Sequence, residues 1–114
     1  MRCILIVDDD RAMVRTLSDI FRLRGWDVLR AHSGEEAVAL QQENRCPVVL
    51  MDIRMPGMDG IAAAQAMRAI TPDALILLMT AETSSGALAD PERKHDLQVI
   101  PKPVDIGGLF QLLG

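Results

Sequence analysis

Four aspartates of the 114-residue chain have the type and spacing for cation and phosphate chemistry. Three consecutive acids, Asp8–Asp10, directly follow one short apolar run, and Asp52 directly follows another. If these runs are neighbouring parallel strands, the carboxylates meet at one edge of a sheet, where two of them about 4 Å apart repel by roughly 4 kcal/mol at an effective dielectric of 20. Such a cluster must spread out, hold a proton or bind a cation. With oxygen ligands alone, the expected cation is Mg²⁺.

Thr80 and Lys102 also follow apolar runs, so the same edge should carry a hydroxyl and an ammonium group. Singly, such a threonine is typical of a turn, and a lysine before proline is typical of a solvated side chain. Jointly they indicate phosphoryl transfer, in which the acid attacks while cation, hydroxyl and ammonium bind the equatorial oxygens. Pro103 restricts Lys102 to an extended backbone, and the bond between them is a candidate for cis geometry.

The elements that must position these residues are predicted from five apolar runs that alternate with segments of helical periodicity. The runs are Cys3–Val7, Trp26–Leu29, Pro47–Met51, Leu75–Met79 and Leu97–Ile100. Their spacing of about 20 to 30 residues fits strand–helix–strand units of a parallel sheet. The second and fifth runs carry charged residues, glutamine or proline at their ends and are expected at the edges. The predicted fold is α/β, a doubly wound, flavodoxin-like five-stranded parallel sheet of order 2-1-3-4-5 with helices on both faces.

Capping residues predict where the helices begin. Asp10 precedes the first helix, Ser33 with Glu36 forms a capping box for the second, and Asp59 is the expected N-cap of the third. Of the three consecutive acids that follow the first strand, Asp10 is therefore assigned to capping the helix rather than to binding the cation.

The last two helices are expected to be short or weak. Asp90 and Pro91 are typical of a helix start, so a fourth helix is predicted from about Pro91 to about Asp96, after a loop over residues 82–89. A final helix follows Asp105, although two glycines in its first turns cost roughly 1 kcal/mol each.

Composition excludes several classes of protein. Hydrophobic residues at 49% and charged residues at 25% fit a globular chain, and the length fits one domain over residues 1–114. A net charge of -4 argues against a nucleic-acid binder, which needs a basic face. No apolar run approaches the roughly 20 residues that cross a bilayer, and the start of the chain lacks the features of a signal peptide.

The cysteines and histidines are expected to have no part in the chemistry. Cys3 and Cys46 fall at the amino ends of adjacent predicted strands and are expected as buried free thiols, which favours a cytoplasmic location. His32 and His95 are expected on the surface or in loops, away from the acids.

Four segments together resemble the receiver domain of two-component response regulators. They are Ile4–Asp9, Val48–Gly60, Met79–Ala81 and Lys102–Pro103, and the resemblance covers the whole chain. Its central stretch, Met-Pro-Gly-Met-Asp-Gly, is highly specific. The resemblance implies that Asp52 is the phosphoacceptor. It further implies that Asp9 binds Mg²⁺ directly, that Asp8 helps through water, and that the backbone carbonyl of Arg54 is a further ligand.

The resemblance also implies a switch. Thr80 would turn its hydroxyl onto the phosphoryl group and Lys102 would pair with it, so that the added charge of about -1.5 to -2 biases the surface around the fourth helix and fifth strand. Receivers usually carry an aromatic residue three positions before the lysine, where this chain has Val99. Because valine strongly prefers one rotamer, coupling is expected to be weaker or carried by backbone displacement.

The implied function is that of a phosphoacceptor signalling domain in a two-component phosphorelay. A histidine kinase or phosphotransfer protein would donate the phosphoryl group from a phosphohistidine, with Mg²⁺ as cofactor. The domain would promote only its own phosphorylation and dephosphorylation, and so is not expected to be an enzyme. An output domain or downstream protein would recognise the switched face, and a second copy of the chain is a further candidate partner. Neither a membrane nor nucleic acid is expected to contact this chain directly.

Two alternatives stay open on the residues alone. In the first, the chain is a receiver-like docking module that is not phosphorylated, which the departures at Val99 and Pro91 keep open. In the second, the Asp-x-Asp at residues 8–10 resembles that of haloacid-dehalogenase-like phosphatases, and Asp8 would attack phosphate esters. The phosphatase would leave Asp52 without a role, and 114 residues leave little room for a substrate cap.

Overall fold

Five parallel strands form one sheet in the computed structural model, which describes residues 2–81 and 98–113. The strands are β1 (Cys3–Val7), β2 (Asp27–Ala31), β3 (Val48–Asp52), β4 (Leu75–Thr80) and β5 (Gln98–Pro101). Their order is β2-β1-β3-β4-β5, so the second and fifth strands lie at the edges. The predicted fold class, strand order and edge strands are confirmed, and strand ends differ from the predicted runs by at most two residues.

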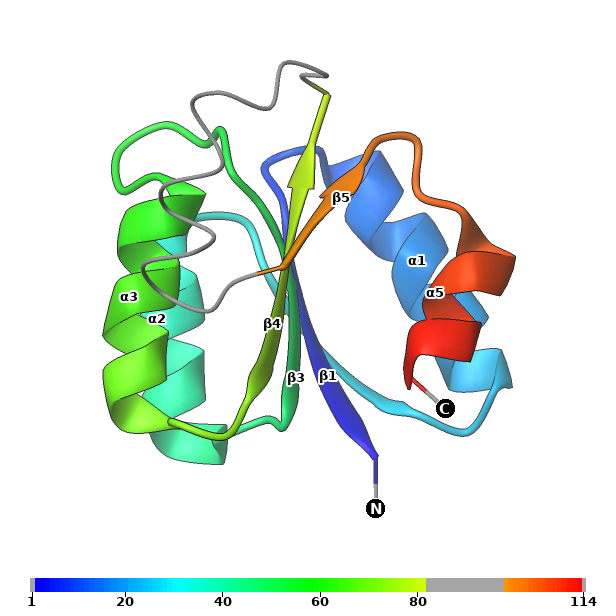
Figure 1. Ribbon diagram of the computed structural model, residues 1–114, viewed down its shortest axis with the longest axis horizontal. Coiled ribbons are helices and arrows are strands. Elements are labelled where there is room, and N and C mark those ends of the chain that lie inside the picture. The colour runs from blue at the N-terminus through cyan, green and yellow to red at the C-terminus, as the bar shows by residue number, and fades with distance from the viewer. Residues whose placement is uncertain (1, 82–97, 114) are drawn as a thin grey trace.

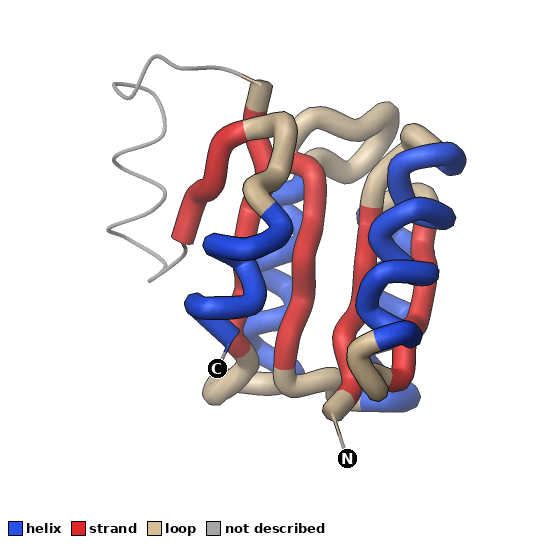
Figure 2. Tube along the Cα trace, turned by 90° about the vertical axis from the view of Figure 1, so that its right-hand side faces the viewer, coloured by secondary structure: helices blue, strands red, loops and turns tan. Residues whose placement is uncertain are grey.

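Helices cover both faces of the sheet. They are α1 (Arg11–Leu23), α2 (Gly34–Asn44), α3 (Gly60–Ile70) and α5 (Ile106–Leu113). In Figure 1, α2 and α3 lie on one side of the sheet and α1 and α5 on the other. Figure 2 looks onto the α1 and α5 side, with these two helices in front of the strands. Within residues 2–81 and 98–113, no helix combines the length and apolar character that crossing a bilayer requires.

The core is divided into two apolar clusters by the sheet itself. Side chains alternate between faces along a strand, so Leu5 and Val7 pack with α2 and α3 while Ile4 and Ile6 pack with α1 and α5. Residues Ile4 to Val7 are all completely buried. This two-sided burial is why the central strands are continuously apolar, and it holds their carboxyl ends in one rigid edge.

The predicted caps lie at the helix starts. Asp10 Oδ1 accepts from the main-chain nitrogen of Met13 at 3.2 Å, which begins α1 directly beside the end of β1. Asp59 caps α3 in the same way, and Ser33 Oγ accepts from Glu36 N at 3.1 Å to begin α2. The capping box differs from the prediction in its return bond, because the Glu36 carboxylate accepts from the residue before the cap. The predicted fourth helix lies outside the described residues.

Cys3 and Cys46 form a disulfide, so the expectation of two free thiols is wrong. The cause is the parallel pairing of β1 and β3, which brings the amino ends of both strands together. The two Cα atoms are 5.4 Å apart, inside the range of about 4.4–6.8 Å that disulfides span. The bond lies at the opposite edge of the sheet from the acidic residues. It also removes the support that free thiols lent to a cytoplasmic location.

Candidate metal centre

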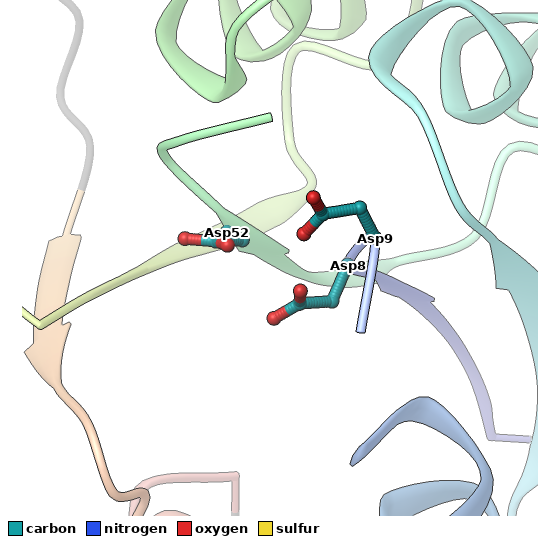
Figure 3. A group of neighbouring side chains, drawn as sticks. All are labelled: Asp8, Asp9 and Asp52. Carbon is teal, nitrogen blue, oxygen red and sulfur yellow. The ribbon is translucent and has the colours of Figure 1, made fainter. Parts of the chain in front are cut away.

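Three carboxylates gather where β1 and β3 end. Asp8 and Asp9 follow β1, Asp52 is the last residue of β3, and one carboxylate oxygen of each lies within 4.8 Å of the others (Figure 3). The two strands pair in parallel with Val7 opposite Met51, so the residues that follow must emerge side by side. The structure therefore brings together the acids that the sequence placed at the ends of two separate runs.

Two of the three acids are removed from water. Asp8 is 1% exposed and Asp52 is 8% exposed, whereas Asp9 is exposed. Asp8 Oδ1 accepts from the main-chain nitrogen of Asp10 at 2.9 Å, which orients its carboxylate at the start of α1. Asp52 Oδ1 accepts from the main-chain nitrogen of Arg54 at 3.2 Å, so the Arg54 backbone lies against the carboxylate.

Burial raises the pKa of Asp52, and the negative charge of Asp8 raises it further. The hydrogen bond from Arg54 and the charge of Lys102 act in the opposite direction without cancelling the rise. Burial first, and the charge of Asp8 second, thus disfavour the ionised form of Asp52. A cation bound among these carboxylates would favour the ionised form of Asp52.

Lys102 bridges the two buried carboxylates. Its Nζ lies 2.9 Å from Asp8 Oδ2 and 3.2 Å from Asp52 Oδ2. Burial by itself lowers the pKa of Lys102, but the hydrogen bonds and charges of both aspartates outweigh it and the net shift is upward. The ammonium is thus held in its charged form beside Asp52. The bond from Lys102 to Pro103 is cis.

Thr80 ends β4 at the same edge and is 6% exposed. Its main-chain oxygen accepts from Lys102 N at 2.8 Å, so the ends of β4 and β5 are linked. Thr80 pairs with Pro101, two positions after the pairing of Leu78 with Val99, so Thr80 and Val99 lie on the same face of the sheet. Val99 packs against the cluster that contains Leu78.

Gly60 allows the loop after Asp52 to fold back onto the strand. Gly60 N donates to Ile53 O at 2.7 Å, so α3 begins directly against the end of β3. A Cβ added at Gly60 would collide with the main-chain oxygen of Asp52 and lie 2.7 Å from Ile53 Cα. Glycine is therefore required here because the start of α3 approaches the main chain at the end of β3 so closely.

One residue beside the centre was missed at the sequence level. His32 was expected to lie away from the acids, but its Nδ1 is 3.2 Å from the main-chain oxygen of Asp8, so that expectation is wrong. The cause is the register of the two strands, because Val7 pairs with Ala31 and both next residues leave the sheet together. The sequence did contain an indication of this contact. His32 comes shortly after the apolar run of the second strand, as Asp8 comes after that of the first, so both could have been expected at the carboxyl edge of the sheet. His95, the other histidine, lies outside the described residues.

The donor set fits Mg²⁺. All side-chain ligands offered are carboxylate oxygens, which suit a small hard cation that keeps several waters. A carboxylate, an ammonium group and a hydroxyl-bearing residue share this edge of the sheet, the groups that phosphoryl transfer requires.

Comparison with known proteins gives consistent results over nearly the whole chain. The family model described as the response regulator receiver domain matches residues 4–113. A response regulator receiver protein of Anaeromyxobacter is 39% identical over 112 residues, which cover 98% of this chain and 47% of that protein. Sporulation initiation phosphotransferase F of Bacillus subtilis is 31% identical over 103 residues, 90% of this chain and 83% of that protein. The chain thus spans about half the length of the first relative and most of the second.

A solved structure agrees with the fold. The chemotaxis protein CheY4 of Vibrio cholerae superposes with a TM-score of 0.89 at 28% identity. The match covers 99% of this chain and 96% of that chain. The similarity therefore extends over the sheet, the helices and the edge that carries the acids.

Proposed function

Because the chain belongs to the response regulator receiver family, we propose that it is the phosphoacceptor domain of a two-component phosphorelay. In this proposal Asp52 accepts the phosphoryl group from a phosphohistidine of a histidine kinase or phosphotransfer protein. The observation that carries the proposal is the environment of Asp52: a buried carboxylate, 3.2 Å from the Lys102 ammonium and clustered with Asp8 and Asp9. A cytoplasmic location of the domain is part of the same proposal, together with its kinase partner.

The transfer forms one bond and breaks one. An Asp52 oxygen attacks phosphorus, the phosphorus–nitrogen bond breaks, and its electron pair stays on the departing imidazole. Lys102 is already at the reacting carboxylate, so its ammonium needs only a short movement to reach a phosphoryl oxygen. Thr80, at the end of β4, would donate a hydrogen bond from its hydroxyl to a second phosphoryl oxygen.

Mg²⁺ is the proposed cofactor. The three clustered carboxylates and the main-chain carbonyl of Arg54 are the groups proposed to hold it. When bound, it supplies positive charge that stabilises the phosphoryl oxygens during transfer. The hydrogen bond from Asp10 N to Asp8 Oδ1 helps to orient the Asp8 carboxylate at this edge of the sheet.

The proposed signal is a change at the ends of β4 and β5. The new phosphate adds charge of about -1.5 to -2 beside Asp52. Lys102 and Thr80 are joined through a main-chain hydrogen bond, so drawing either group inward displaces both strand ends. An output domain, a downstream protein or a second copy of the chain would recognise the resulting surface around β5.

Mass spectrometry after treatment with acetyl phosphate and Mg²⁺ tests the proposal. The unmodified protein is expected to gain the mass of one phosphoryl group, located on the peptide that contains Asp52. D52N is expected to gain none, and D73N, which changes an exposed acid outside the centre, is expected to behave as the unmodified protein. Phosphorylation of D52N at Asp8, or none of the unmodified protein, would overturn the assignment.

A receiver-like docking module that is never phosphorylated remains a second candidate because the position expected to hold an aromatic residue holds Val99. The phosphatase alternative has less support. Its nucleophile would be Asp8, which is 1% exposed and already bonded to Lys102 and to the nitrogen of Asp10. Turnover of small phosphate esters with Mg²⁺ separates the phosphatase from the other two, and the mass measurement separates the receiver from the docking module.

A further inference from the structure

A pocket of about 410 Å³ lies between the start of α1 and the carboxyl end of β2. It is lined by Arg11, Ala12, Val14, Arg15, Arg30 and His32. This set includes three guanidinium groups and no carboxylate. We propose that the pocket binds a small ligand that carries two or more phosphate or carboxylate groups.

The fold places these charges together from two elements. Arg30 pairs with Ile6, whose side chain packs with α1, so Arg30 projects on the α1 side of the sheet. β2 is an edge strand, and no further strand lies outside it in the described sheet. Arg11 and Arg15 are four residues apart on α1 and therefore share one helical face. The basic groups of helix and strand thus converge on one space.

These arginines have no protein partner in the part of the chain that the structure describes. Neither an ion pair nor a hydrogen bond engages the guanidinium groups of Arg11, Arg15 and Arg30 there. Lys102, in contrast, pairs with two aspartates. Like charges gathered without counter-charges repel one another, and a bound anion removes that repulsion.

Overall charge does not account for the pocket. The chain carries 16 acidic residues against 12 lysines and arginines, yet three of those twelve line this one space. A guanidinium group binds phosphate or carboxylate through two parallel hydrogen bonds, a geometry that a lysine ammonium does not provide. The volume also falls within the range of about 300–1,000 Å³ typical of small-ligand pockets. These features favour specific binding of a small ligand with several negative charges over nonspecific attraction of anions to the surface.

The pocket is separate from the phosphoacceptor edge. Neither Asp52 nor Lys102 lines it, and among its lining residues His32 approaches the acidic cluster, with Nδ1 3.2 Å from Asp8 O. The inference therefore stands on different residues from the proposed function. A variant that removes a pocket arginine should leave phosphorylation of Asp52 by acetyl phosphate unchanged.

Isothermal titration with sodium pyrophosphate in metal-free buffer, repeated with citrate, tests the proposal. One saturable site is expected for each anion. R15Q and R30Q should each weaken binding by about tenfold or more, because each removes a charge-assisted pair of hydrogen bonds. R22Q is the matched control, since it removes the same charge from an exposed position on the same helix, outside the pocket. It should change the dissociation constant less than about twofold.

Nitrogen-15 NMR of the unmodified protein provides the location. Pyrophosphate should shift the amide signals of the first turns of α1 and the end of β2. The absence of saturable binding would overturn the proposal, as would equal weakening by R22Q or shifts confined to the loop around Lys102. Urea unfolding of each variant checks that a loss of binding does not come from loss of the fold.

Discussion

The ammonium group of Lys102 lies 2.9 Å from a carboxylate oxygen of Asp8, closer than its 3.2 Å approach to Asp52. The two residues are 94 positions apart in the chain, and Asp8 is almost completely buried. Lys102 therefore compensates the charges of two acids at once. Any change that removes one of these three charges should be measurable in the stability of the protein.

Asp52→Asn is expected to stabilise the metal-free protein at neutral pH. Burial and the charge of Asp8 raise the pKa of Asp52, so its ionised form is disfavoured in the folded state. Removing that charge should increase the free energy of unfolding by on the order of 1 kcal/mol. Urea unfolding in EDTA measures the change. Asp73→Asn, at an exposed site, should have no effect, and a less stable D52N would contradict the argument.

The stability of the metal-free protein is also expected to depend on pH through Asp52. Because the folded-state pKa of this acid is raised, the folded state binds more protons than the unfolded state above the ordinary pKa of about 4. The contribution of Asp52 should thus decrease as pH rises from about 4 through the raised folded-state value. Comparing urea unfolding of the unmodified protein and D52N across this range isolates the effect. Parallel curves would show that Asp52 titrates as it does in the unfolded chain.

Lys102→Gln is expected to destabilise the metal-free protein at pH 7 by about 1–3 kcal/mol, because buried Asp8 loses its charged partner. The pKa of Lys102 is raised, so its stabilising contribution is complete below the ordinary value of about 10.4 and is lost as pH rises through the folded-state value. The difference between Lys102→Gln and the unmodified protein should therefore shrink in strongly alkaline solution. A constant difference from pH 7 to that range would argue against an electrostatic role.

Mg²⁺ is expected to raise the melting temperature of the unmodified protein. A ligand present at about 100 times its dissociation constant adds about 2.7 kcal/mol to the free energy of unfolding. Asp9→Asn should reduce this gain because Asp9 supplies one of the three clustered carboxylates. Differential scanning calorimetry with and without Mg²⁺ gives the measurement, with Asp73→Asn as the control. An equal gain in both variants would place the ion elsewhere.

Gly60→Ala is expected to destabilise the protein by about 1–3 kcal/mol, because the new Cβ collides with the main chain of Asp52 and Ile53. Gly107→Ala provides a matched control in α5. There the added Cβ meets only Asp105 Oδ1 at 3.7 Å, an ordinary contact, and better helix propensity should stabilise the protein by about 1 kcal/mol or less. Thermal unfolding distinguishes the two. Similar effects of both substitutions would mean that close approach at Gly60 is relieved by movement of the loop.

The sequence by itself determined the sheet and its order. Alternating apolar runs and helical segments imply crossovers between parallel strands, and edge strands are distinguished by their polar ends. All strands of a parallel sheet end at one edge, so Asp8, Asp52, Thr80 and Lys102 could be assigned to that edge from their positions after the runs. Local rules also sufficed for the helix starts at Asp10 and Asp59.

Only the tertiary structure decided which of these groups touch. The pairing of Lys102 with Asp8, the approach of His32 to Asp8 and the disulfide between Cys3 and Cys46 all depend on strand register. Register and the face on which each side chain lies are set by packing between elements that are distant along the chain, and a shift of one residue reverses every face. The basic pocket has the same origin, since Arg15 and Arg30 share no local sequence relationship and meet because α1 packs beside an edge strand.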